Sequence, residues 1–231
     1  MSILHRETIE LNTAAGRLSA LIIRPEGDAP LPGVVQIQEW WGIEPHAIEV
    51  AQRLAGAGFV VLLPDLYHGR VVTEPDEAMK AVMMLRGNMD SAVRDIQRGI
   101  DALKARPDVQ PQRVGIMGFC VGGLLAWEVT LRSPDIAAAV PWYAGGFDPT
   151  LERLADLHTP VFAIYGGSDP SIPLETIHKV EALLKDKPDS AVRVYPAAGH
   201  AFLNPSHGAL HAASAEDAWP RAVAFLKTHV K

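Results

Sequence analysis

The residues best suited to chemistry surround the single cysteine of the chain, in the stretch GFCVGG at residues 118–123. Gly118 and Gly122 flank Cys120 with the spacing of the Gly-x-Ser-x-Gly turn, which exposes a nucleophile between a strand and a helix. Glycine is required on both sides because so sharp a turn presses these two positions together. The start of the following helix favours a thiolate, and the backbone N–H of Val121 can donate to an oxyanion. The stretch therefore predicts that Cys120 is a nucleophile.

A cysteine nucleophile needs a base, and the base needs a group that orients it. Asp169 follows a predicted strand at 160–165, and His200 follows another at 191–195. Each lies in the loop after its strand, as Cys120 does, so parallel strands bring all three to one edge of a sheet. The order nucleophile, acid, histidine is the one found with this type of turn. The sequence therefore predicts a Cys-His-Asp triad.

Positioning these residues requires strands that alternate with helices, and the hydrophobic pattern has this alternation. Buried strands are predicted at 33–38, 59–64, 113–118, 136–143, 160–165 and 191–195. Helices are predicted at 45–57, 91–105, 121–132, 174–185 and 215–229. Two alternating segments at the front, 5–11 and 17–24, predict a hairpin. The sequence thus predicts an α/β fold, with a mostly parallel central sheet, helices on both faces and an antiparallel N-terminal edge.

The chain is predicted to form one domain. Its 231 residues suit a single large α/β domain spanning 1–231, and no repeat, linker or low-complexity run divides them. The segment 65–90 is predicted to be a partly helical, cap-like excursion from that domain.

The composition argues against several classes of partner. A net charge of −6 and the lack of any Lys/Arg run argue against nucleic-acid binding. No apolar run reaches the roughly 18 residues that a membrane span needs, so no membrane association is expected. A single cysteine forbids an internal disulfide, and the polar N-terminus lacks the pattern of a signal peptide. We therefore expect a cytoplasmic protein, a monomer or small homo-oligomer, whose partner is a small molecule.

Five stretches of the chain together resemble the dienelactone hydrolase (carboxymethylenebutenolidase) family of α/β-hydrolases. They are QEWWGI (38–43), PDLYHGR (64–70), GFCVGG (118–123), YGGSDPSIP (165–173) and GHAFLNP (199–205). The resemblance spans most of the chain and implies an α/β-hydrolase fold. It also implies hydrolysis of an ester or lactone through a thioacyl-enzyme, with no cofactor. The spacing of His200, His207 and His211 fits no common ligand pattern, so no metal is expected.

The resemblance assigns roles residue by residue. Cys120 matches the family nucleophile, His200 the base and Asp169 its partner. Glu39 matches the family glutamate that contacts the thiol in the resting enzyme. The backbone N–H of Trp40 is then the second oxyanion donor beside that of Val121, since one donor comes from the loop after the third strand.

The chain departs from the family where the substrate is held. Asn204 stands where the family has a carboxylate-binding arginine, and an amide cannot supply that charge. Lys80 and Arg86 are the cations that could replace it. The predicted substrate-binding residues are otherwise apolar or aromatic, and the full set is Tyr143, Asn204, Trp41, Tyr67, Phe202 and Met83.

Two alternatives stay open from the sequence. Within the same class, Asn204 favours a general carboxylesterase for neutral esters. In a different class, the chain could be a non-catalytic α/β-hydrolase scaffold or a thiol redox sensor. A scaffold has no need of Asp169 and His200, and a sensor usually has a resolving cysteine, which this chain lacks.

Overall fold

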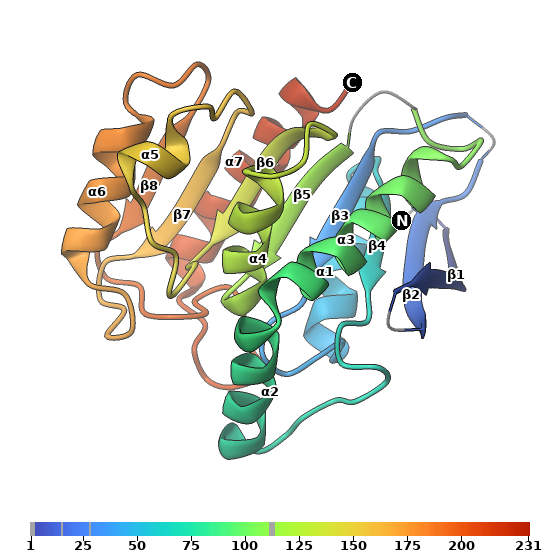
Figure 1. Ribbon diagram of the computed structural model, residues 1–231, viewed down its shortest axis with the longest axis horizontal. Coiled ribbons are helices and arrows are strands. Elements are labelled where there is room, and N and C mark those ends of the chain that lie inside the picture. The colour runs from blue at the N-terminus through green and yellow to red at the C-terminus, as the bar shows by residue number, and fades with distance from the viewer. Residues whose placement is uncertain (1–2, 15, 28, 111–113) are drawn as a thin grey trace.

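Figure 1 shows the computed structural model of the chain, which describes residues 3–14, 16–27, 29–110 and 114–231. Its centre is an eight-stranded sheet in the order β1-β2-β4-β3-β5-β6-β7-β8. The strands are β1 (Leu4–Thr13), β2 (Gly16–Pro25), β3 (Gly33–Ile37), β4 (Val60–Pro64), β5 (Val114–Phe119), β6 (Ile136–Trp142), β7 (Phe162–Gly166) and β8 (Ala191–Tyr195).

The sheet is mostly parallel. All neighbours from β4 through β3 to β8 pair in parallel, whereas β1 pairs antiparallel with β2, and β2 antiparallel with β4. Strands β3 to β6 are buried along their whole length, as expected for parallel strands covered on both faces. The predicted fold class and the antiparallel N-terminal edge are confirmed. Residue 113 of the predicted fifth strand and residue 15 of the predicted hairpin turn lie outside the described residues.

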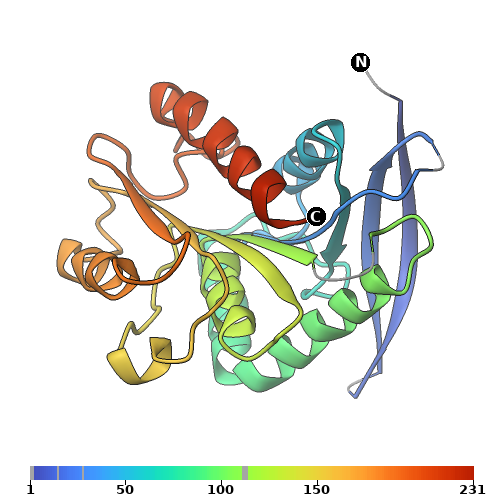
Figure 2. The same ribbon diagram turned by 90° about the horizontal axis from the view of Figure 1, so that it is seen from above.

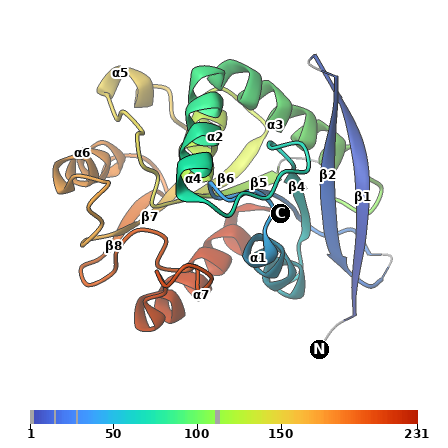
Figure 3. The ribbon, with the colours of Figure 1, turned by 90° about the horizontal axis from the view of Figure 1, so that it is seen from below.

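The helices form two layers around the sheet. They are α1 (Pro45–Gly56), α2 (Pro75–Gly87), α3 (Met89–Lys104), α4 (Val121–Thr130), α5 (Leu151–Leu154), α6 (Leu174–Leu184) and α7 (Ala212–His229). Helices α1 and α7 cover one face of the sheet, while α3, α4 and α6 cover the other (Figures 2 and 3). The segment predicted as an excursion contains α2, which projects from one end of the molecule (Figure 1). The short α5 was not predicted, because four residues are too few to show a helical period.

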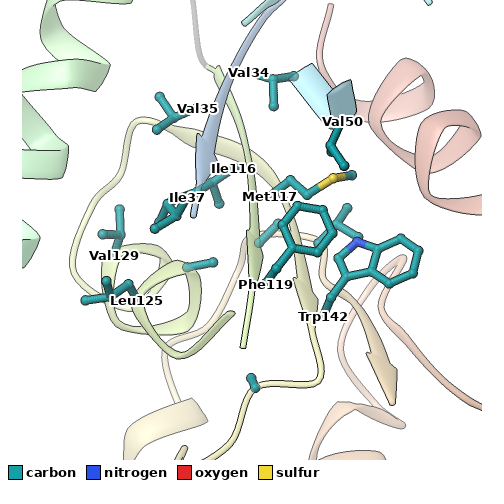
Figure 4. Packing of buried hydrophobic residues seen from close by; sticks show 14 of the residues in the cluster. Val34, Val35, Ile37, Val50, Ile116, Met117, Phe119, Leu125, Val129 and Trp142 are labelled. Atoms are coloured by element: carbon teal, nitrogen blue, oxygen red, sulfur yellow. The ribbon is translucent and has the colours of Figure 1, made fainter. Parts of the chain in front are cut away.

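The core is formed by apolar side chains that the central strands direct to alternate faces. Met117 and Phe119 of β5 lie on one side with Trp142 and with Val50 of α1 (Figure 4). Ile37 lies on the opposite side with residues of α4 (Figure 4). Both layers of helices are therefore held to the sheet by apolar burial, at about 25 cal/mol for each Å² removed from water.

Helix α3 shows how the sequence pattern produces this packing. Val93, Ile96, Ile100 and Leu103 recur at helical spacing and are all buried, so the predicted apolar face does pack onto the sheet. No helix among the described residues combines the length and apolar character that crossing a membrane requires.

Candidate active site

Cys120 occupies a strained turn between the end of β5 and the start of α4. Its backbone has φ 57° and ψ −116°, a left-handed conformation that costs a residue with a side chain about 1–3 kcal/mol. The backbone N–H of Cys120 donates to the carbonyl of Trp142 at 3.1 Å, which ties the turn to the end of β6. The side chain of Cys120 stays partly exposed to solvent. The strained backbone conformation therefore occurs at the residue that the sequence predicts as the nucleophile.

The flanking glycines are required by direct contact with the backbone. A Cβ on Gly118 would collide with the carbonyl oxygen of Gly122, and a Cβ on Gly122 would collide with the carbonyl oxygen of Gln38. A Cβ on Gly123 would collide with the carbonyl oxygen of Trp142. Backbone atoms cannot move aside as a flexible side chain can, so these positions accept only glycine.

Asp169 and His200 meet beyond the ends of β7 and β8. Nδ1 of His200 lies 2.6 Å from Oδ2 of Asp169, whose side chain is fully buried. An ionised carboxylate can only accept a hydrogen bond, so the proton of a neutral His200 lies on Nδ1. Nε2 is then free to act as a base, as in a triad.

The pKa values of this pair move in the directions that an ion pair requires. Burial works against protonation of His200, but hydrogen bonds and charge from Asp169 and Cys120 raise the pKa of His200 to about 10. Burial also acts to raise the pKa of Asp169, yet hydrogen bonds from His200 and Ser171 bring it below its usual range. Asp169 therefore stays ionised beside a histidine that holds a proton strongly.

Glu39 lies buried behind this site and is held on both oxygens. The hydroxyl of Tyr143 donates to Oε1 at 3.0 Å, and Nδ2 of Asn204 donates to Oε2 at 2.7 Å. Burial raises the pKa of Glu39, against the effect of these two hydrogen bonds and of His200. Asn204 also donates to Oε1 of Glu44 at 3.0 Å. Asn204 thus faces two carboxylates.

A pocket of about 470 Å³ opens beside Cys120. It is lined by Trp40, Met79, Val82, Arg86, Cys120, Val121, Gly145, Gly146, Ser171 and His200. The pocket therefore brings together four of the predicted residues, namely Cys120, Val121, His200 and Trp40. Among the described residues that line it, the positive charges are those of Arg86 and, when protonated, His200.

The residues predicted to bind substrate lie elsewhere. Tyr143 is fully buried, with its ring centre 5.2 Å from that of His200, and Phe202 packs against Tyr143 in the core. Trp41 stacks on His207, with 4.0 Å between ring centres. The remaining three lie as follows: Asn204 faces Glu39 and Glu44, Tyr67 lines a separate cavity of about 290 Å³, and Met83 is exposed on α2.

The pocket wall also contains residues outside the predicted set of substrate-binding residues. Met79, Val82 and Arg86 recur on α2 at a spacing of three and four residues, which puts them on one helix face. Of the two cations considered, Arg86 lines the pocket, where its Nη2 donates to the carbonyl of Gly145 at 2.8 Å. Ser171 could have been noticed from its position two residues after Asp169. In the part of the chain that the structure describes, no three His, Cys, Asp or Glu side chains form a group that could hold a metal ion.

The chain is similar to known proteins along most of its length. The sequence model described as "Dienelactone hydrolase family" matches residues 18–230. The chain is 31% identical over 217 residues to an Escherichia coli protein named "Putative carboxymethylenebutenolidase", covering 88% of this chain and 79% of that one. It is 34% identical over 208 residues to protein usf of Aquifex pyrophilus, covering 86% of this chain and 89% of that one.

The fold of the chain is also similar to that of solved structures. The chain superimposes with a TM-score of 0.90 on a dienelactone hydrolase-like promiscuous phosphotriesterase from metagenomic libraries, at 25% identity and with 99% of each chain covered. The architecture is that of the α/β-hydrolases. On the match of its sequence from residue 18 to residue 230, the chain belongs to the dienelactone hydrolase family of carboxylic ester hydrolases.

Proposed function

We propose that the protein hydrolyses an ester or lactone by a Cys-His-Asp mechanism that passes through a thioacyl-enzyme. One observation carries the proposal: the pocket beside the strained Cys120 also contains His200, whose Nδ1 lies 2.6 Å from Asp169. A nucleophile, a base and an orienting carboxylate are the parts that acyl transfer requires.

The first half of the reaction acylates the cysteine. The thiolate of Cys120 attacks the carbonyl carbon, and the carbonyl π electrons move to oxygen. The N–H groups of Val121, at the first turn of α4, and of Trp40 stabilise that oxyanion; one such donor is typically worth about 2.7–4 kcal/mol. When the C–O bond breaks, protonated His200 gives its proton to the leaving alkoxide or enolate. The product of this half is a thioester on Cys120.

The second half releases the acid. His200, now neutral with its proton on Nδ1, takes a proton from water through Nε2 as that water attacks the thioester carbonyl. The oxyanion collapses, the C–S bond breaks, and the thiolate of Cys120 is restored beside protonated His200. Asp169 holds the imidazole in position throughout and stays ionised. No further group is needed to balance either half.

A general carboxylesterase acting on neutral esters is the second candidate. It is favoured by the contacts of Asn204, which occupies the position of the family arginine yet is buried against Glu39 and Glu44. The opposite preference, for a substrate that carries a carboxylate, is favoured by Arg86 in the pocket wall. The two candidates share the chemistry and differ in the charge of the substrate.

The experiment compares kcat/KM for an anionic dienelactone and a neutral p-nitrophenyl ester, on the wild type and on Cys120→Ala. We expect Cys120→Ala to lower kcat/KM for both by at least about a thousandfold, since loss of a nucleophile removes most of the acceleration. If Cys120→Ala retains wild-type rates, or if neither substrate is turned over, the proposed mechanism is wrong.

Arg86→Gln then distinguishes the two candidates. If Arg86 binds a substrate carboxylate, the variant loses about ten- to a hundredfold in kcat/KM with the dienelactone and little with the neutral ester. Lys80→Gln serves as the matched control, because Lys80 is also on α2 but does not belong to the pocket wall. An equal, small effect of Arg86→Gln on both substrates favours the general carboxylesterase.

A further inference from the structure

Ser171 contacts both Asp169 and His200. Its Oγ donates to Oδ1 of Asp169 at 2.6 Å, and its backbone N–H donates to the same oxygen at 2.8 Å. The same Oγ lies 3.2 Å from Nδ1 of His200. Ser171 also lines the pocket that holds Cys120. A residue outside the predicted triad therefore touches two of its three members.

The two donors from Ser171 fix the rotation of the Asp169 carboxylate. They occupy Oδ1, so that Oδ2 is left to accept from Nδ1 of His200 at 2.6 Å. Without these hydrogen bonds, the Asp169 carboxylate could rotate about its Cβ–Cγ bond and lose its alignment with the His200 imidazole. The ring of Pro170, between Asp169 and Ser171, restricts its own φ to about −65° and so stiffens the loop.

The direction of these hydrogen bonds also determines which ring nitrogen carries the proton of neutral His200. The hydroxyl proton of Ser171 is committed to Asp169, so the Oγ presents a lone pair toward Nδ1. Both neighbours of Nδ1 are then acceptors, and the proton of neutral His200 belongs on that nitrogen. This leaves Nε2 unprotonated, which is the form that takes a proton from water in the second half of the proposed reaction.

We propose that Ser171 is a positioning residue of the triad. Its hydroxyl group prevents the Asp169 carboxylate from rotating and keeps the proton of neutral His200 on Nδ1. The inference rests on the proposed function, since it assigns Ser171 to the same reaction. Ser171 acts here through Asp169 and His200 and makes no covalent bond.

The test measures kcat and KM of Ser171→Ala as a function of pH, with the neutral p-nitrophenyl ester as substrate. Loss of a hydrogen bond to a charged group predicts a kcat about ten- to a hundredfold lower, with KM within about twofold of the wild type. The acid limb of the profile should also move to higher pH. Burial acts to raise the pKa of Asp169, and the hydrogen bonds from His200 and Ser171 act to lower it. Loss of the Ser171 hydroxyl should therefore raise the pKa of Asp169.

Two further variants separate the hydroxyl from other effects. Ser171→Thr keeps the hydroxyl and should restore kcat and the acid limb to near wild-type values. Ser168→Ala removes a hydroxyl from the same loop, where Oγ donates to the carbonyl of Pro196 at 2.7 Å, and should leave the acid limb in place. A purely structural effect on the loop predicts instead that Ser168→Ala and Ser171→Ala behave alike.

The outcomes keep this inference apart from the proposed function. If the wild type is active, Cys120→Ala is inactive and Ser171→Ala keeps both the kcat and the acid limb of the wild type, the role of Ser171 is wrong while the mechanism stands. A rise in KM at constant kcat also overturns it, because Ser171 would then bind substrate. Activity retained in Cys120→Ala overturns the mechanism itself.

Discussion

Asn204 donates a hydrogen bond to Glu39, with 2.7 Å between Nδ2 and Oε2, and both residues are buried. The same amide group donates to Glu44, so two carboxylates share one neutral donor. Tyr143 completes the arrangement by donating to the other oxygen of Glu39. Both oxygens of Glu39 are thus engaged by groups behind the pocket, and its orientation is set by Asn204 and Tyr143.

Replacing Glu39 by glutamine should change how stability depends on pH. Burial raises the pKa of Glu39 above its ordinary value of 4.5, so the folded protein holds this proton at pH values where the unfolded chain has released it. Wild-type stability therefore loses a contribution as pH rises from about 4.5 through the raised pKa. Glu39→Gln has no proton to lose there, so its unfolding free energy should improve relative to the wild type across this window.

Urea denaturation of both proteins at a series of pH values measures this difference. Glu10→Gln is a suitable control, since Glu10 lies at the surface on β1. A difference between Glu39→Gln and the wild type that stays constant with pH would show that burial does not perturb the Glu39 carboxyl.

The His200 pKa should depend on both of its neighbours. Burial alone would lower it, and the pKa of about 10 results from hydrogen bonds and charge supplied by Asp169 and Cys120. NMR titration of the ring should thus give a lower pKa in Asp169→Asn and in Cys120→Ala than in the wild type. Equal values in all three proteins would mean that neither neighbour acts on the imidazole.

Gly122 in the turn around Cys120 should tolerate alanine poorly. Its Cβ would meet the carbonyl oxygens of Gln38 and Ile37, both of them backbone atoms, so we expect Gly122→Ala to lower the unfolding free energy by about 3 kcal/mol or more. Gly56, in α1, has open space where a Cβ would lie, and Gly56→Ala should instead add about 0.5–1 kcal/mol. Thermal unfolding distinguishes the two; similar small effects would show that the turn can open.

The sequence predicted the fold and the position of Cys120, Asp169 and His200 well, because each depends on local rules. Parallel strands read as apolar runs, and residues just after such strands meet at one edge of the sheet. The glycines around Cys120 follow from the turn itself. These features need no knowledge of how distant side chains pack.

The pocket wall could not be predicted in the same way. It depends on where α2 lies relative to the sheet, and the face that carries Met79 and Arg86 is set by tertiary packing. Asn204 shows the same limit: its place after His200 suggested a substrate contact, but the fold turns its amide toward two buried carboxylates. The orientation of Asn204 follows the two carboxylates that accept its hydrogen bonds, and these come from a distant part of the sequence.

The most direct test of the mechanism is to trap the thioacyl-enzyme and weigh it. His200→Asn should remove the base that deacylation needs, so that a p-nitrophenyl ester leaves its acyl group on the protein. Since Cys120 is the single cysteine of the chain, a thioester can form at that residue alone. Intact-protein mass spectrometry should then show a gain of one acyl group, removed by hydroxylamine and missing in the Cys120→Ala/His200→Asn double variant. An acyl group that persists in the double variant, or ester hydrolysis by the wild type with no adduct on His200→Asn, would contradict the mechanism.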